Sequence, residues 1–171
     1  MEIYSWSIQN GLKKGKNNCT IMVQTLIIAL LEDTMRLWHE ALLPHLPQQW
    51  LLGQHRECCG LRGKGWGRKH KTVDYVFRHP YKNLVMYHWV VIDQLRALGC
   101  NTAWEWDCAN YRGKNCPAWE ETSKEVEAVM SIFECGRPFP IYEEHDEEYL
   151  KECIDLLAGR GVHLNIEDIK A

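Results

Sequence analysis

The segment from Tyr81 to Leu98 constrains the fold more than any other part of the chain. Its core-forming side chains recur near positions i, i+3, i+4 and i+7, and they are Leu84, Tyr87, His88, Val91, Leu95 and Leu98. Side chains at this spacing share one face of an α-helix. We therefore predict an amphipathic helix here, and Gly99 is expected to end it.

A second helix is predicted from Pro47 to about Leu61. Proline suits the first turn of a helix, because its missing N–H would have no partner there anyway. The stretch that follows, residues 60–70, has four glycines within eight positions, together with several bases. Such a density of glycine is expected to exclude regular helix, so this stretch is predicted to be a basic, glycine-rich loop.

The C-terminal half predicts two further helices, at about residues 122–136 and 146–159. The first is expected to begin after Thr122 or Ser123 as its N-cap and to end at Gly136. The second is expected to begin after Asp146 and to end at Gly159 or Gly161. Residues 101–119 are rich in aromatics and predict irregular structure. Strand patterns are weak throughout, so we expect an all-α, compact single-domain helical fold.

The composition is that of an ordinary globular chain: 46% of the 171 residues are hydrophobic and 25% are charged. Of its eight cysteines, Cys58 and Cys59 are adjacent and none forms a Cys-x-x-Cys pair. A chain of this length needs no disulfide staples, so reduced thiols and a cytoplasmic location are expected.

Charge is distributed unevenly although the net charge is only −3. Residues 54–82 carry eight bases against Glu57 and Asp74, whereas residues 118–171 carry fourteen acids against five bases. A basic block of this kind predicts a surface that binds a polyanion, and two solvated surfaces are the alternative.

Residues 1–34 differ from the rest and are treated as a separate N-terminal extension, with residues 35–171 as the domain proper. The apolar run from Ile21 to Leu31 is too short to span a bilayer and meets acids directly, so no membrane partner is expected, and an interfacial helix is the alternative. The residues just before Met35 can be encoded by a purine-rich ribosome-binding sequence containing GAGGA. We therefore expect translation to start at Met35.

An ordered set of residues carries a family resemblance between about Met35 and Gly99. Arg36 follows Met35, and the helix predicted from Pro47 carries Gln49 and then the adjacent pair Arg56 and Glu57. The glycine-rich loop holds Arg68, Lys69 and His70. The set resembles the pyrimidine dimer DNA glycosylases of the phage endonuclease V type. On a helix, Gln49 and Arg56 share one stripe with Glu57 beside it. Gly53 lies one turn before Glu57, where it leaves room either for a nucleotide or for another helix.

The resemblance implies a DNA repair glycosylase with abasic-site lyase activity, which acts through an imine formed by an N-terminal amine. The nucleophile would be the amine of Met35, since an α-amino group has a pKa low enough to be partly neutral at pH 7. Glu57 would be the carboxylate that stabilises charge on the sugar and transfers protons, and its alternative is a surface ion pair. No cofactor and no metal are implied.

The partner that the resemblance implies is double-stranded DNA, with no obligate protein partner. The residues predicted to contact DNA are Arg36, Gln49, Arg56, Arg62, Lys64, Trp66, Arg68, Lys69 and His70. Trp66 would stack on or wedge beside a base, or else anchor the loop to the core. The acidic C-terminal third is expected to face away from DNA.

Two other classes of function stay open. The same fold could be a DNA-binding module without catalysis, or its basic block could bind RNA or another acidic partner. The Cys/His content raises zinc binding, but neither the eight-residue spacing of Cys100, Cys108 and Cys116 nor the group of His55, Cys58 and Cys59 has the pairing of a structural zinc site. The lesion could be a pyrimidine dimer or a related damaged base.

Overall fold

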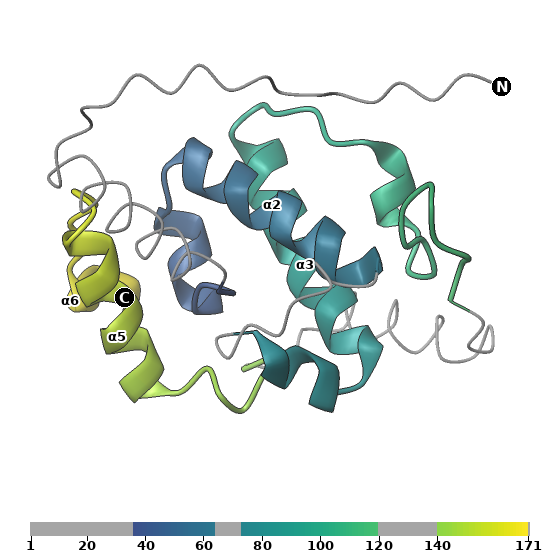
Figure 1. Cartoon of the computed structure of the whole chain (residues 1–171). Helices are drawn as coiled ribbons and strands as arrows, with labels where there is room; N and C mark the ends of the chain where they lie inside the picture. The colour runs from purple at the N-terminus through teal and green to yellow at the C-terminus, as the bar shows by residue number, and fades with distance from the viewer. Residues whose placement is uncertain (1–35, 64–72, 120–139, 171) are drawn as a thin grey trace, which may run out of the picture. The chain divides into compact units, whose positions relative to one another are not determined.

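The chain is described by a computed structural model for residues 36–63, 73–119 and 140–170 (Figure 1). Every regular element in these ranges is a helix, which confirms the predicted all-α class. The α-helices are α2 (Gln48–Gly63), α3 (Tyr81–Ala97), α5 (Glu147–Ala158) and α6 (Ile166–Lys170), and the 3-10 helices are η1 (Glu40–His45), η2 (Asp74–Arg78) and η3 (Trp104–Asp107). The predicted helix at 122–136 lies outside the described residues.

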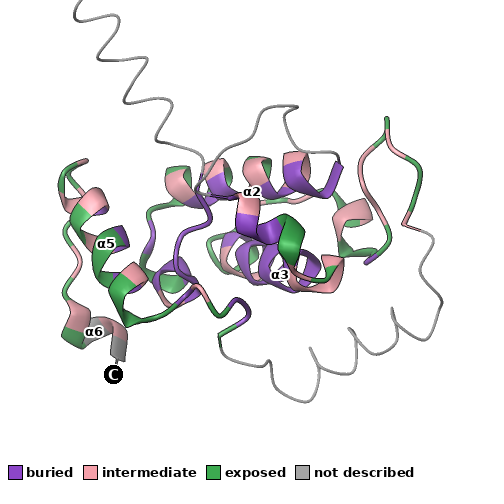
Figure 2. Ribbon diagram, turned by 60° about the horizontal axis from the view of Figure 1, so that its bottom comes forward, coloured by how far each residue is buried: buried purple, intermediate pink, exposed green. Residues whose placement is uncertain are grey.

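The helices α2 and α3 lie side by side and form the centre of the core (Figures 1 and 2). The residues of α2 that point inward, among them Leu51, Cys58 and Leu61, are buried against α3. On α3, every residue from Leu84 to Ile92 is buried. The helix is therefore covered on more sides than an amphipathic stripe would require, because η1, η2 and the segment from Ile141 onward also pack around it.

The predicted bounds of α3 are confirmed to within a residue. Gly99 has a φ of +77°, a left-handed conformation in which a side chain would be strained, and its N–H donates to the carbonyl of Arg96. The Cys100 N–H then donates to the carbonyl of Leu95, which satisfies another carbonyl of the last turn. Beyond this turn, residues 101–119 contain only the short η3, as the sequence predicted.

The helix α2 ends at Gly63, two residues beyond the predicted end at about Leu61, so the start of the stretch predicted as a glycine-rich loop is helical. Arg112 explains this extension. Its Nε donates to the carbonyl of Arg62 and its Nη2 to that of Gly63, so the last carbonyls of the helix have partners. A Cβ at Gly63 would lie 3.4 Å from the Arg112 carbonyl oxygen, so Arg112 packs closely against this end of the helix.

The last predicted helix is confirmed as α5. The Asp146 side chain accepts a hydrogen bond from the Tyr149 N–H at 2.8 Å, which caps the helix as expected. The chain leaves α5 through Gly161, whose φ is +81°. The short α6 that follows was not predicted.

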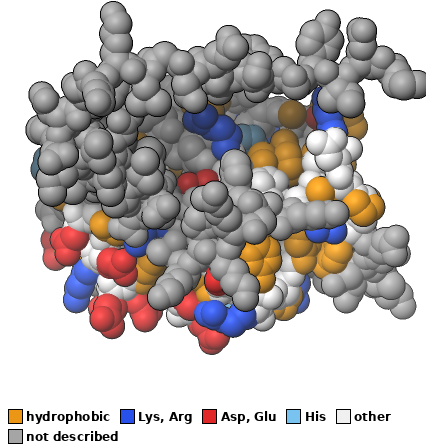
Figure 3. Space-filling model, viewed as in Figure 1, with side chains coloured by type: hydrophobic (Ala, Val, Ile, Leu, Met, Phe, Trp, Pro, Cys, Tyr) orange, Lys and Arg blue, Asp and Glu red, His pale blue; other side chains and the backbone are white. Residues whose placement is uncertain are grey.

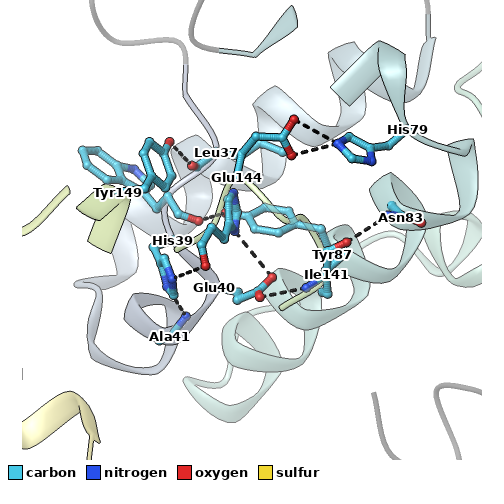
Figure 4. Close-up of polar contacts among 12 residues, drawn as sticks. Leu37, His39, Glu40, Ala41, His79, Asn83, Tyr87, Ile141, Glu144 and Tyr149 are labelled. Carbon is cyan, nitrogen blue, oxygen red and sulfur yellow. Dashed lines mark hydrogen bonds and ion pairs between the residues drawn. The ribbon is translucent and has the colours of Figure 1, made fainter. Parts of the chain in front are cut away.

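The segment before α2 is held in place by residues that are distant in sequence. Tyr149 donates its hydroxyl to the carbonyl of Leu37 at 2.6 Å, and the buried carboxylate of Glu40 accepts the Ile141 N–H at 2.8 Å (Figure 4). From α3, the hydroxyl of Tyr87 donates to the carbonyl of Trp38 at 2.6 Å. Residues 36–40 therefore have one fixed path across the core.

None of the described helices is long and apolar enough to cross a membrane. The six cysteines in the described ranges are Cys58, Cys59, Cys100, Cys108, Cys116 and Cys153, and none of them is in a disulfide.

Replacing Tyr87 with Phe tests how firmly this path is fixed. The change deletes one hydroxyl and leaves the buried carbonyl of Trp38 without its donor, which is expected to lower the free energy of unfolding by about 1–3 kcal/mol. Urea denaturation followed by circular dichroism measures the loss. A change below about 0.5 kcal/mol, within the range of ordinary surface substitutions, would show that this hydrogen bond does not hold the segment.

Candidate functional site

The centre of the candidate site is the side-chain amide of Gln54, which lies on α2 and is 1% exposed. Its Nε2 donates to the carbonyl of Arg36 at 3.2 Å and to Oε2 of Glu57 at 2.9 Å. Its Oε1 accepts the N–H of Trp38 at 2.8 Å. One amide thus joins the backbone of residues 36–38 to the carboxylate of Glu57. Met35, one residue earlier, lies outside the described residues.

The sequence prediction of the site omitted Gln54. It stands three residues before Glu57, so both side chains lie on one face of α2. A polar side chain on the buried side of a helix needs hydrogen-bond partners, and this requirement was the signal that could have identified it.

Glu57 has the electrostatics of an acid–base group. Burial raises the pKa of its carboxyl from the ordinary 4.5 to about 8, while the hydrogen bond from Gln54 and the positive charge of Arg160 oppose the rise. Both the acid and the carboxylate are therefore populated near neutral pH, which suits a group that gives and takes protons. This environment disfavours the alternative of an exposed surface ion pair.

The surface of α2 next to Glu57 is open. Gln49 and Arg56 are both exposed, and the only hydrogen bond of the Arg56 side chain within the described ranges is to the carbonyl of Leu52, at 3.1 Å. A Cβ at Gly53 would meet no described atom within 4 Å. The described residues thus give no support to a second helix packing at Gly53, and they leave space one turn from Glu57.

The phosphate contact predicted for Arg36 needs correction, since its side chain is 3% exposed. Its Nη2 pairs with Glu152 of α5 at 3.0 Å, and its guanidinium lies 5.6 Å from the ring centroid of Tyr149. We infer that the Arg36 side chain holds α5 against residues 36–40. The backbone carbonyl of Arg36 belongs to the site, because it accepts a hydrogen bond from Gln54.

The phosphate contact predicted for Arg62 needs the same correction, because this side chain is fully buried. Its two Nη atoms donate to the carbonyls of Trp106, Cys108 and Ala109 at 2.7–3.2 Å, and its Nε donates to the hydroxyl of Tyr81. A guanidinium committed in this way organises the irregular segment after α3 and cannot reach DNA without unfolding it. The remaining residues predicted to contact DNA are outside the described ranges, and they are Lys64, Trp66, Arg68, Lys69 and His70.

On the opposite face of α2, His55 and Cys59 approach His88 of α3 closely enough to suggest a metal site. Arg62 argues against a cation here. Its Nη1 lies 3.2 Å from Nδ1 of His88, and a guanidinium can only donate, so we assign the imidazole proton to Nε2, which then donates to Nδ1 of His55 at 2.7 Å. A protonated Nε2 cannot ligate a metal.

The same surroundings disfavour nucleophilic catalysis by cysteine. Burial raises the pKa of the Cys59 thiol to about 12 and also raises that of the fully buried Cys58, so neither forms a thiolate at neutral pH.

The described residues thus define a small all-α domain whose N-terminal segment is tied to a partly buried, helix-borne carboxylate. Residues 35–107 match the model of the family described as pyrimidine dimer DNA glycosylase. The matched segment contains α2, α3, Gln54 and Glu57, and the match confirms the resemblance that the sequence suggested. For this segment of the chain, the match supports a similarity to DNA repair glycosylases. Searches of the curated proteins and of the solved structures found no match.

Replacing Glu57 with Gln is expected to change how stability depends on pH. In the wild type the unfolded carboxyl loses its proton near pH 4.5 and the folded one near pH 8. Between these values the folded state holds the extra proton, so the free energy of unfolding of the wild type falls as pH rises. The Gln variant has no carboxyl at position 57, so its free energy of unfolding lacks this decrease with pH.

We therefore expect the stability of Glu57→Gln relative to wild type to increase steadily between about pH 5 and pH 8 and then level off. Urea denaturation at a series of pH values measures it. The control is Glu148→Gln on the exposed part of α5, which should show no such trend. A flat difference for Glu57→Gln would mean that the carboxyl is not buried as described.

Proposed function

We propose that the domain is a DNA glycosylase with abasic-site lyase activity that removes a damaged pyrimidine, such as a pyrimidine dimer or a related lesion, from double-stranded DNA. The observation that carries the proposal is the Gln54 amide, whose single nitrogen binds both the carbonyl of Arg36 and the carboxylate of Glu57. One amide group therefore separates the backbone carbonyl of Arg36 from an acid–base group. The family match over residues 35–107 supports the same class.

The nucleophile in this proposal is the backbone amine of Met35. The nitrogen attacks C1′ of the damaged nucleotide, the bond from C1′ to the base breaks, and the base leaves with a proton. Opening of the sugar gives an imine between the amine and C1′. The imine acidifies the C2′ hydrogen, and its removal expels the 3′ phosphate and breaks the strand. The amine exists only in a chain that begins at Met35, so we propose residues 35–171 as the catalytic unit.

Glu57 would act twice in this sequence. As the neutral acid it gives a proton when the sugar opens, and as the carboxylate it stabilises positive charge at C1′ and accepts the C2′ proton. A pKa of about 8 leaves both forms accessible at neutral pH. Because the Gln54 nitrogen remains bound to the carboxylate, the oxygen that faces the sugar keeps its position.

The open face of α2 would receive the DNA. Arg56 and Gln49 are exposed there and are proposed to contact phosphate and the opened nucleotide. The loop residues Lys64 to His70 would extend this contact, and the target nucleotide must leave the base stack for C1′ to reach the amine.

Borohydride trapping on a duplex with one abasic site tests the proposal. Protein that starts at Met35 should form a covalent adduct that maps to the Met35 amine, whereas the 171-residue chain should not. Glu57→Gln should bind the duplex within about threefold of wild type and cleave it at least about a hundredfold more slowly, as expected when a general acid–base group is lost.

Two results would contradict parts of this account. If the protein that starts at Met35 gives no adduct but binds DNA with strong salt dependence, the domain is a binding module without catalysis. Unchanged cleavage by Glu57→Gln would remove that carboxyl from the mechanism.

Gly53 provides a further test. Alanine there should stabilise the folded domain by about 1 kcal/mol, because helix propensity rises and no described atom within 4 Å is in the way. If a nucleotide approaches this turn, the added methyl group should reduce single-turnover strand cleavage by about tenfold through steric overlap. A more stable variant with unchanged cleavage would place the nucleotide elsewhere.

A further inference from the structure

The C-terminal end of α5 holds a cation that the sequence did not connect with the site. The Arg160 N–H donates to the carbonyl of Leu157 at 3.0 Å, and the Val162 N–H donates to the same carbonyl at 2.9 Å. Gly161 between them takes the left-handed conformation at a φ of +81°. The backbone of Arg160 is therefore fixed by a helix-ending turn.

Two tryptophans position the Arg160 side chain. Its guanidinium carbon lies 5.7 Å from the ring centroid of Trp50 and 6.0 Å from that of Trp38. The two indoles meet edge to face with their centroids 5.6 Å apart. A guanidinium at this distance from indole rings is attracted to them while it keeps its charge and its N–H donors.

Within the described residues, no carboxylate neutralises this guanidinium. Arg160 is half-buried, so part of it reaches solvent, and within the described ranges it forms no ion pair with a carboxylate. Arg36, in contrast, is buried and paired with Glu152. Of the two arginines that pack on Trp38, Arg160 is therefore the one without an acidic partner among the described residues.

This cation also influences the carboxyl of Glu57. Its charge favours the ionised form of Glu57, and Trp38, which it packs against, donates its N–H to Gln54. Among the described residues, the polar and charged groups that lower the pKa of Glu57 are Gln54 on its own helix and Arg160 after α5. The positive charge of Arg160 is thus connected to the proposed reaction centre through Trp38 and Gln54.

We propose that Arg160, Trp38 and Trp50 form a phosphate-binding subsite that holds the DNA backbone next to Glu57. This inference rests on the proposed function, which supplies DNA as the ligand. A planar guanidinium matches two phosphate oxygens at once. The partly exposed indole of Trp50 suits the apolar face of a sugar, while the buried indole of Trp38 supports the guanidinium from inside.

The subsite revises the expectation that the whole C-terminal third faces away from DNA. The acids of α5 include Glu147, Glu148, Glu152 and Asp155, which are all exposed, and Figure 3 shows acidic side chains gathered over this helix. Arg160 follows the last turn of α5, beyond these acids, and it packs on Trp38 and Trp50 from other parts of the chain. The end of the helix can therefore meet DNA while its acidic surface does not.

The test compares three variants of the protein that starts at Met35, with affinity for an abasic-site duplex as the first readout. Arg160→Gln should weaken binding by about tenfold at roughly 0.1 M salt, and the slope of log affinity against log salt should decrease by about one. Arg160→Lys keeps the charge and should recover part of the affinity. Lys151→Gln removes an exposed charge from the same helix and should change binding by less than about twofold.

The second readout is the pH dependence of strand cleavage in single turnovers. Loss of the Arg160 charge should raise the pKa of Glu57 further. The part of the pH–rate profile that follows ionisation of Glu57 should therefore move to higher pH in Arg160→Gln and stay near wild type in Arg160→Lys. A residue that only packs against the indoles would lower stability without moving this profile or the salt slope.

The outcomes separate this inference from the proposed function. If the wild type traps and cleaves while Arg160→Gln binds with unchanged affinity and slope, the subsite is refuted and the enzyme stands. If the wild type never traps but Arg160→Gln still loses affinity and slope relative to Lys151→Gln, the catalytic proposal fails and the subsite stands. Absence of any duplex binding by the wild type overturns both.

Discussion

The arrangement of this domain depends on one buried amide. Gln54 has almost no exposure, and its nitrogen and oxygen are both committed, to Arg36, Trp38 and Glu57. A buried polar group must keep its partners, because each lost hydrogen bond costs free energy of folding. The same hydrogen bonds therefore fix both the backbone path of residues 36–38 and the position of the Glu57 carboxyl.

The rest of the molecule reinforces this constraint from a distance in sequence. Tyr87 of α3 and Tyr149 of α5 each donate a hydroxyl to a carbonyl of the N-terminal segment, and Glu152 pairs with Arg36. The acidic helix α5 thus has a structural role in the site, although it lies beyond residues 35–107, which match the glycosylase family. Arg160, from the turn after that helix, adds the charge that we assign to phosphate binding.

Local patterns were enough to predict the helices that local forces specify. The spacing of apolar residues gave α3, Asp146 gave the start of α5, and both helices end at glycines with positive φ, Gly99 and Gly161. The prediction was wrong where distant partners decide the outcome. Gly60 and Gly63 are helical because Arg112 binds the end of α2, and the charge of Arg62 is used inside the fold.

The same distinction applies to the site. Glu57 could be proposed from its place among bases, and the three-residue spacing from Gln54 to Glu57 was available in the sequence. The contact of Gln54 with Arg36 and those of Arg160 with Trp38 and Trp50 join distant parts of the chain, which local spacing does not encode.

The central claim is that the amine at the head of the domain and the carboxyl of Glu57 meet at one sugar. A crystal structure of the borohydride-trapped complex between protein that starts at Met35 and an abasic-site duplex tests it most directly. The account predicts a covalent bond from the Met35 nitrogen to C1′, with a Glu57 oxygen within hydrogen-bond distance of the sugar and Gln54 still bound to the Arg36 carbonyl. Attachment through a lysine side chain, or a sugar remote from Glu57, would contradict it.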